Sequence, residues 1–249
     1  MQTIDHYASE EYLRLVLQGS PGSGKTTLAA QFPGAYFLDI DHNLGGALRF
    51  LKEKKLALPV GYDFVDTDTA GKLIPVRDRY QRMNMLLQEA QLNPAIQTIV
   101  IDSATNLADI LIEETLRLQG KTKISDYKDG RQFWGFFAQY SKQLMSIFTQ
   151  MRKNLVLIAH EKLEKNEDGA VVYPVKVNWP GQVGAVIGAW FTDVWRCEVK
   201  TQPNGLKTDY IWQIRTMPDF KYELKNSLLL PPTFTFDWKL IDEKLHPKK

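Results

Sequence analysis

The segment from Gly19 to Thr27 combines residues whose types and spacing suit the binding of phosphate groups. It fits the pattern of a glycine, four residues, and then Gly-Lys-Ser/Thr. The glycines permit backbone angles that other residues avoid, so successive amides can surround phosphate oxygens. Lys25 would contact the β- and γ-phosphates, and the Thr26 hydroxyl would bind Mg²⁺. The segment therefore predicts nucleotide contacts from Gly19, Ser20, Pro21, Gly22, Ser23, Gly24, Lys25, Thr26 and Thr27.

Asp102 is the second candidate for this chemistry. It ends the strongly apolar run Thr-Ile-Val-Ile-Asp over Thr98–Asp102. Proteins with a phosphate loop place an acidic residue at such a strand end, where it holds the magnesium shell. Asp102-Ser103 would also suit a turn or a helix cap. Because the phosphate loop is present, we assign Asp102 to magnesium together with Thr26.

The elements that must position these residues alternate along the chain. A short buried strand over Leu13–Gln18 precedes the loop, and a helix begins at about Thr26. We expect further strands and helices at Ala35–Asp39, Leu44–Lys55, Val60–Val65, Arg77–Leu92, Thr98–Asp102, Thr105–Leu118, Phe133–Arg152 and Leu155–Ala159. Strands that alternate with helices predict an α/β fold, with a largely parallel sheet covered on both faces.

The last third of the chain changes character. Asp168-Gly169 and Pro203-Asn204-Gly205 each separate two strand-like runs, which indicates hairpins. The parallel sheet is therefore expected to continue into antiparallel C-terminal strands. The sequence contains no repeat and no Pro/Gly/Ser-rich linker, so we expect a single domain over residues 1–249.

Composition restricts the class of protein without identifying it. The 249 residues are 44% hydrophobic and 24% charged, as in ordinary globular proteins, and the net charge of +2 gives no reason by itself to expect nucleic acid. No apolar run reaches the roughly 20 residues of a membrane helix, and the first residues lack the layout of a signal peptide. The single cysteine, Cys197, excludes an intramolecular disulfide and is expected in the core. These features favour the cytoplasm.

Together, these motifs resemble the RecA-like ATPases, and most closely the phage-encoded RecA-core annealing proteins of the Sak type. The resemblance covers roughly residues 12–232. It implies a RecA-like three-layer domain, ATP and Mg²⁺ as ligands, and the cytoplasm of a bacterial host. The run Phe37-Leu-Asp-Ile-Asp41 is similar to a family strand that ends in Asp-x-Glu, whose last carboxylate orients the attacking water. That role passes to Asp41, which is one methylene shorter than the usual Glu; a simple turn residue is the alternative.

The resemblance also assigns residues that respond to ATP. His160 ends the run Leu155-Val-Leu-Ile-Ala-His160, where RecA-like proteins carry a polar residue that senses the γ-phosphate. The segments around Trp179, Asp193–Cys197, Ile214–Thr216 and Leu224–Asn226 resemble the closing hairpin of the phage group. A basic residue there reaches the ATP site of a neighbouring subunit. Lys225 is the first choice, with Arg215 and Lys221 behind it; an ordinary surface lysine is the alternative.

Two stretches match the loops with which RecA-like recombinases hold single-stranded DNA, namely Gln119–Gln132 and Glu161–Asn178. Basic and aromatic residues in them suit phosphate contacts and base stacking. The second stretch also contains Glu161, Glu164, Glu167 and Asp168, and a solvated loop would look similar. The candidates for DNA binding are Lys121, Lys123, Tyr127, Lys128, Arg131, Lys162, Lys165, Tyr173 and Lys176.

The leading hypothesis is an ATPase that binds single-stranded DNA as a homo-oligomer and promotes annealing or strand exchange. A single-strand-binding protein would deliver the DNA, and no membrane partner is expected. A nucleotide-gated regulatory or scaffolding protein without DNA binding is one alternative, and a hexameric helicase-like translocase is another. A small-substrate kinase is less favoured, because no lid or arginine-rich acceptor segment is evident. Stimulation of ATP hydrolysis by DNA would separate the first and third hypotheses from the others.

Overall fold

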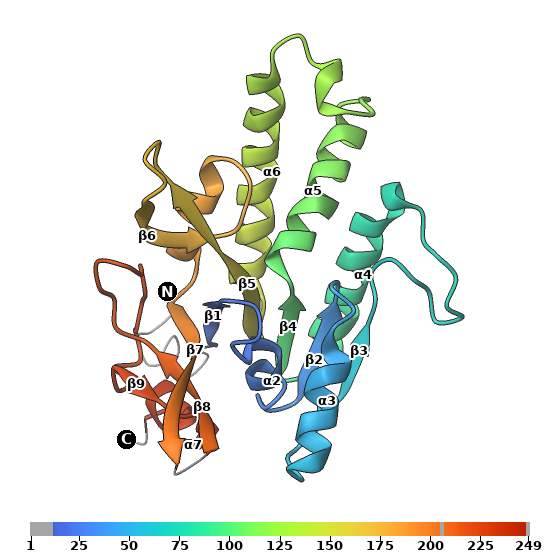
Figure 1. Cartoon of the computed structure of the whole chain (residues 1–249). Coiled ribbons are helices and arrows are strands. Elements are labelled where there is room, and N and C mark those ends of the chain that lie inside the picture. Colours follow the sequence, from blue (N-terminus) through green and yellow to red (C-terminus); the bar gives the residue numbers. More distant parts are fainter. Residues whose placement is uncertain (1–11, 205–206, 248–249) are drawn as a thin grey trace, which may run out of the picture.

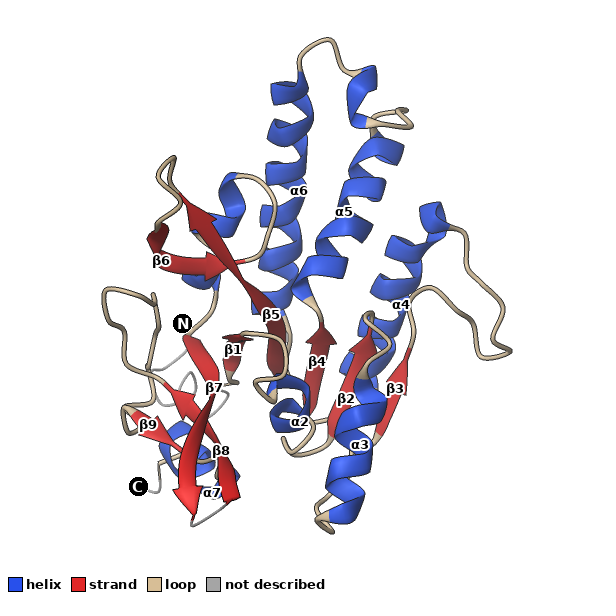
Figure 2. Ribbon diagram, in the orientation of Figure 1, coloured by secondary structure: helices blue, strands red, loops and turns tan. Residues whose placement is uncertain are grey.

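The structure is a computed structural model that describes residues 12–204 and 207–247. A twisted central sheet carries helices on both faces (Figures 1 and 2). Its strand order is β3-β2-β4-β5-β1-β7-β8-β9, and β6 pairs with β5 outside this path. No helix in the described part of the chain is long and apolar enough to cross a membrane.

The first part of the sheet is parallel. It contains β1 (Arg14–Gly19), β2 (Ala35–Asp39), β3 (Gly61–Asp63), β4 (Thr98–Asp102) and β5 (Asn154–Lys165), and β7 (Asp193–Asn204) runs parallel to β1. The antiparallel strands are β8 (Lys207–Arg215) and β9 (Thr233–Phe234) beyond β7, and β6 (Val171–Val177) beside β5. The predicted fold class is therefore confirmed: a largely parallel α/β sheet extended by antiparallel C-terminal strands.

Successive strand residues point to opposite faces, and both faces are apolar. Val16, Leu38 and Ile101 belong to the core beneath α4 (Arg79–Leu92), α5 (Ala104–Leu118) and α6 (Gly130–Gln150). Leu17, Phe37 and Val100 belong to the core beneath α2 (Lys25–Ala29), α3 (Leu44–Glu53) and α7 (Trp238–Leu245). Short 3₁₀ turns occur at Val76–Asp78, Ile124–Asp126, Gln182–Ala185 and Ile187–Trp190.

Most elements differ from the sequence expectation by a few residues at their ends, as β3 and α6 do, and two differ by more. Strand β5 does not end at Ala159 but continues to Lys165, where it forms a hairpin with β6. Helix α7 was not predicted; its N-cap is Asp237, whose carboxylate accepts hydrogen bonds from Lys239 N and Leu240 N. The single-domain assignment over residues 1–249 stays a prediction, because residues 1–11 lie outside the described part.

A buried carboxylate connects the antiparallel region to the sheet. Asp193 is fully buried at the start of β7. It accepts hydrogen bonds from Trp195 Nε1 (3.2 Å), Ser227 N (2.9 Å) and Ser227 Oγ (2.5 Å). These bonds fix the segment that follows β8 against the strand beside β1.

We predict that Asp193→Ala lowers the free energy of unfolding by about 2–4 kcal/mol, because buried donors lose their acceptor. Urea unfolding measures the change, and Asp168→Ala at an exposed turn is the matched control. A loss below about 0.5 kcal/mol, within the usual range of surface substitutions, would show that Asp193 does not anchor this segment.

Candidate functional site

The phosphate loop connects the end of β1 to the start of α2 in a conformation that only glycine permits at two positions. Gly19 has φ 154° and Gly24 has φ 87°. A Cβ atom at Gly19 would lie 2.6 Å from Cys197 O, and one at Gly24 would lie 2.6 Å from Cδ1 of Trp212. The backbone turns here with no space for side chains, as a loop that presents its amides to a ligand requires.

The ammonium group of Lys25 lies against the same loop. Lys25 is 5% exposed, and its Nζ donates to Gly19 O (2.8 Å) and Ser20 O (2.9 Å). Burial lowers the pKa of this side chain, which means that its positive charge lacks full compensation. Phosphate oxygens would supply the missing negative charge, as the sequence prediction for Lys25 requires.

The two predicted magnesium ligands lie together. Thr26 Oγ1 donates to Asp102 Oδ2 at 2.7 Å. Asp102 is 1% exposed, and burial raises the pKa of its carboxyl group to about 7, with Asp41 and Asp39 adding to the increase. A hydroxyl and a buried carboxylate beside the loop fit Mg²⁺, which prefers oxygen ligands and completes its shell with water and phosphate oxygens.

Asp41 and His160 meet at the same edge of the sheet. Strand pairing places Asp39 opposite Asp102 and His160 opposite Gly19. Asp41 Oδ1 accepts hydrogen bonds from Ser103 N (3.1 Å), Ser103 Oγ (3.0 Å) and Asn106 Nδ2 (2.8 Å). Its Oδ2 lies 3.8 Å from His160 Nε2. The structure brings the two residues together, while their roles toward a nucleotide stay predictions.

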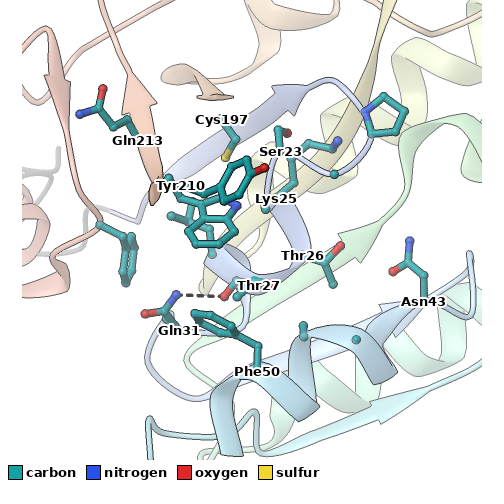
Figure 3. A pocket seen from close by; sticks show the side chains of 18 of the residues that line it. Ser23, Lys25, Thr26, Thr27, Gln31, Asn43, Phe50, Cys197, Tyr210 and Gln213 are labelled. Atoms are coloured by element: carbon teal, nitrogen blue, oxygen red, sulfur yellow. Dashed lines mark hydrogen bonds between the residues drawn. The ribbon is translucent and has the colours of Figure 1, made fainter. Parts of the chain in front are cut away.

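A cavity of about 700 Å³ opens beside the phosphate loop (Figure 3). The loop from Pro21 to Thr27 borders it, together with Asp102 and His160. Sequence reasoning missed the opposite wall, which comes from distant segments and includes Gln31, Phe50, Tyr210, Trp212 and Phe236. Cys197 also borders the cavity; burial raises its thiol pKa to about 12, as suits the predicted core residue.

The three candidates for a trans-acting cation are held within their own chain. Lys225 Nζ donates to Phe191 O and, at 3.3 Å, to Gly188 O. Arg215 Nη1 donates to Asp219 Oδ2 at 2.6 Å, and Arg215 Nε lies 3.7 Å from Glu198 Oε2. Lys221 Nζ lies 5.5 Å from the ring centroid of Phe220. A role in a neighbouring site would require Lys225 or Arg215 to exchange these partners.

The predicted DNA-binding residues fall on two projections from the carboxyl edge of the parallel strands (Figure 1). Lys121, Lys123, Tyr127, Lys128 and Arg131 lie at the tip between α5 and α6. Tyr127 is half-buried there and packs against Phe133. Lys162 and Lys176 lie directly opposite each other on β5 and β6, while the side chains of Lys165 and Tyr173 lie outside the described part.

A group of charged residues, which the sequence did not indicate as a unit, connects the loop to the antiparallel strands. Arg196 Nε and Nη2 donate to the two carboxylate oxygens of Glu161 at 2.6 and 3.3 Å, and Nη1 donates to Glu198 at 3.0 Å. Ser20 Oγ donates to Glu161 at 3.3 Å, and the Arg196 guanidinium lies 4.1 Å from the Tyr222 ring centroid. The residue after His160 thus contacts both the phosphate loop and β7.

Arg196→Ala should lower the free energy of unfolding by about 3–5 kcal/mol, because the largely buried Glu161 loses its cation and Glu198 keeps only the longer contact with Arg215. Arg196→Lys should retain part of the stability but lose the forked hydrogen bonds. Urea unfolding provides the measurement, with exposed Arg131→Ala as the control. If both arginine-to-alanine variants unfold at the same urea concentration, the Arg196 contacts do not support the fold.

The buried carboxyl group of Asp102 predicts a specific pH dependence for the metal-free protein. Its folded pKa of about 7 lies above the unfolded value of about 3.8, so the unfolded chain binds fewer protons between those values. Relative to Asp102→Asn, the native protein should therefore lose about 2–4 kcal/mol of stability as the pH rises from 4 to 7, with no further change above 7. Parallel pH profiles for the two proteins in chemical denaturation would contradict this.

Among the comparisons with known proteins, the one with sequence families is informative. A comparison with curated proteins found no match. A solved structure of a KaiC-like protein from the hyperthermophilic archaeon Pyrococcus horikoshii is similar at 16% identity and a TM-score of 0.42, over 85% of this chain and 82% of the other. That score is below the level at which a likeness supports a shared fold or function. The sequence family described as AAA domain matches residues 11–226. The chain therefore belongs to this AAA domain family.

Proposed function

We propose that this protein is a magnesium-dependent ATPase that binds single-stranded DNA as a homo-oligomer and promotes strand annealing or exchange. The phosphate loop and Lys25 would hold the phosphates, and Thr26 and Asp102 would hold Mg²⁺, which stabilises the charge of the transferred phosphoryl group. Asp41 would orient the attacking water from its fixed position beside Ser103 and Asn106. His160 would lie on the γ-phosphate side of the cavity.

The observation that carries the DNA proposal is the continuity of β5. One strand runs from Asn154 through His160, at the cavity, to Lys162 and Lys165 in the β5–β6 hairpin. Lys162 lies opposite Lys176 in the antiparallel pair, so two ammonium groups share one face of the hairpin. Basic side chains that share one face suit an anionic partner, and a DNA backbone supplies closely spaced phosphates.

The regulatory alternative shares the nucleotide site but assigns no DNA contact to Lys162 and Lys176. The translocase alternative would use them and would in addition unwind duplex DNA. Stimulation of ATP hydrolysis by DNA therefore separates the proposal and the translocase from the regulatory alternative, and unwinding of duplex DNA separates the translocase from the proposal.

We predict that single-stranded oligonucleotide raises the rate of ATP hydrolysis several-fold and that Lys25→Ala abolishes hydrolysis with or without DNA. Phosphate release measures both, at low and at moderate salt. The double variant Lys162→Ala/Lys176→Ala should lose most of the stimulation, while Lys239→Ala, at an exposed position of α7, should retain it.

Hydrolysis that is unaffected by DNA at either salt concentration would contradict the recombination function and favour the regulatory one. Unwinding of a duplex with defined polarity would favour the translocase. Unchanged hydrolysis by Lys25→Ala would contradict the proposed ATP site itself.

A further inference from the structure

Part of the cavity beside the phosphate loop extends beyond the loop and Lys25. Its wall there is largely aromatic and includes Phe50 on α3, Tyr210 and Trp212 on β8, and Phe236 after β9. Tyr210 and Trp212 alternate with Ile211 along the strand and therefore share one face. The Phe50 and Trp212 rings meet edge to face, with centroids 6.0 Å apart and planes at 62°. The two rings form a corner that a third planar ring can occupy.

These rings are exposed although they lie in a cavity. Trp212 is 45% exposed and Tyr210 is 61% exposed. Trp212 also contacts the phosphate loop, because its Cδ1 lies 2.6 Å from the position that a Cβ of Gly24 would take. The aromatic wall therefore begins directly beside the loop, where a flat apolar group attached to bound phosphates would meet it.

The amide of Gln31 adds a polar group with a fixed orientation. Its Nε2 donates to Thr27 O at 3.1 Å, at the end of the loop. A main-chain carbonyl only accepts hydrogen bonds, so the NH₂ group must face Thr27. Figure 3 shows the amide oxygen of Gln31 turned away from that bond. Because Gln31 also borders the cavity, its oxygen is an acceptor that a ligand with an N–H donor can use.

The cavity on the other side of the loop provides a contrast. It has about 440 Å³ and is bordered by Ser20–Ser23, Arg196, Glu198, Lys200 and Arg215, with no aromatic side chain. Arg196 and Arg215 pair there with Glu198. Charged groups that already pair with each other do not suit an apolar ring. Of these two cavities, as lined by the described residues, the one with Trp212 has the stacking surface.

We propose that the corner between α3 and β8 is a nucleobase subsite selective for a 6-aminopurine. Trp212 and Phe50 stack on and enclose the purine, and Gln31 Oε1 accepts a hydrogen bond from the 6-amino group. A 6-oxopurine places an acceptor at that position and leaves two oxygens facing each other. The subsite rests on the proposed function, because its ligand must also bind the phosphate loop.

Calorimetric titration in the presence of Mg²⁺ tests the subsite with ADP, IDP and inorganic tripolyphosphate. ADP and IDP differ at the 6-position, and tripolyphosphate has no base. The native protein should bind ADP roughly tenfold more tightly than IDP. Trp212→Ala should lower the affinity for ADP by about tenfold or more, because the stacking contact is lost. Its affinity for tripolyphosphate should stay within about twofold of that of the native protein.

Two further variants make the result specific. Gln31→Leu should bind ADP and IDP with equal affinity, because the acceptor is removed while the stacking rings remain. Tyr62→Ala removes an exposed aromatic ring on β3, outside the cavity, and should leave all three affinities unchanged. Circular dichroism shows whether each variant is folded.

The subsite is contradicted if Trp212→Ala binds ADP with the affinity of the native protein, or if its affinities for ADP and tripolyphosphate fall by the same factor. It is also contradicted if the native protein binds IDP as tightly as ADP. In each case, binding of tripolyphosphate to the native protein would leave the phosphate site intact. If the native protein binds neither ADP nor tripolyphosphate, the proposed ATPase function fails together with the subsite.

Discussion

The site depends on the in-register parallel pairing of β1, β4 and β5. Main-chain hydrogen bonds place Gly19 opposite His160 and Asp102 opposite Ile158. The carboxyl ends of neighbouring parallel strands share one edge, so strand pairing alone brings together the phosphate loop, the predicted magnesium ligand Asp102 and the predicted sensor His160. A one-residue slip of β5 would turn its side chains to the opposite face and remove this arrangement.

The same edge concentrates buried charge. Lys25 lies against its own loop, Asp102 has a raised pKa, and Glu161 depends on Arg196. Each group costs desolvation energy, and for Lys25 the loop carbonyls and the nearby acidic groups offset this cost only in part, because burial still lowers its pKa. A bound phosphate beside Lys25 and a cation beside Asp102 would each offset part of this cost. The Ser20–Glu161–Arg196 contacts give this edge a direct connection to β7 and, through it, to the antiparallel strand β8.

The sequence predicted those parts of this site that each lie within one short stretch of the chain. The phosphate loop is a local motif between a strand and a helix, and Asp102 ends an apolar run that only a buried strand explains. The sequence predicts a hairpin around Asp168-Gly169, and the β5–β6 pair confirms it. That its first strand is continuous with Leu155–Ala159 was not predicted, because charged residues alternate with a lone Leu163 there. The aromatic wall could not be predicted at all. Phe50 and Trp212 are distant in sequence, and only the packing of α3 beside β8 brings them to one cavity.

Hydrogen–deuterium exchange with and without Mg²⁺ and a non-hydrolysable ATP analogue tests the central claim, that a nucleotide binds between the phosphate loop and the antiparallel hairpin. The account predicts slower exchange over residues 19–31, where amides would bind phosphate, and over residues 210–213, beside the base. Exchange near residues 160–163 should slow as well, because this part of β5 continues from the cavity. Unchanged exchange over residues 19–27 would contradict the nucleotide site and everything that depends on it.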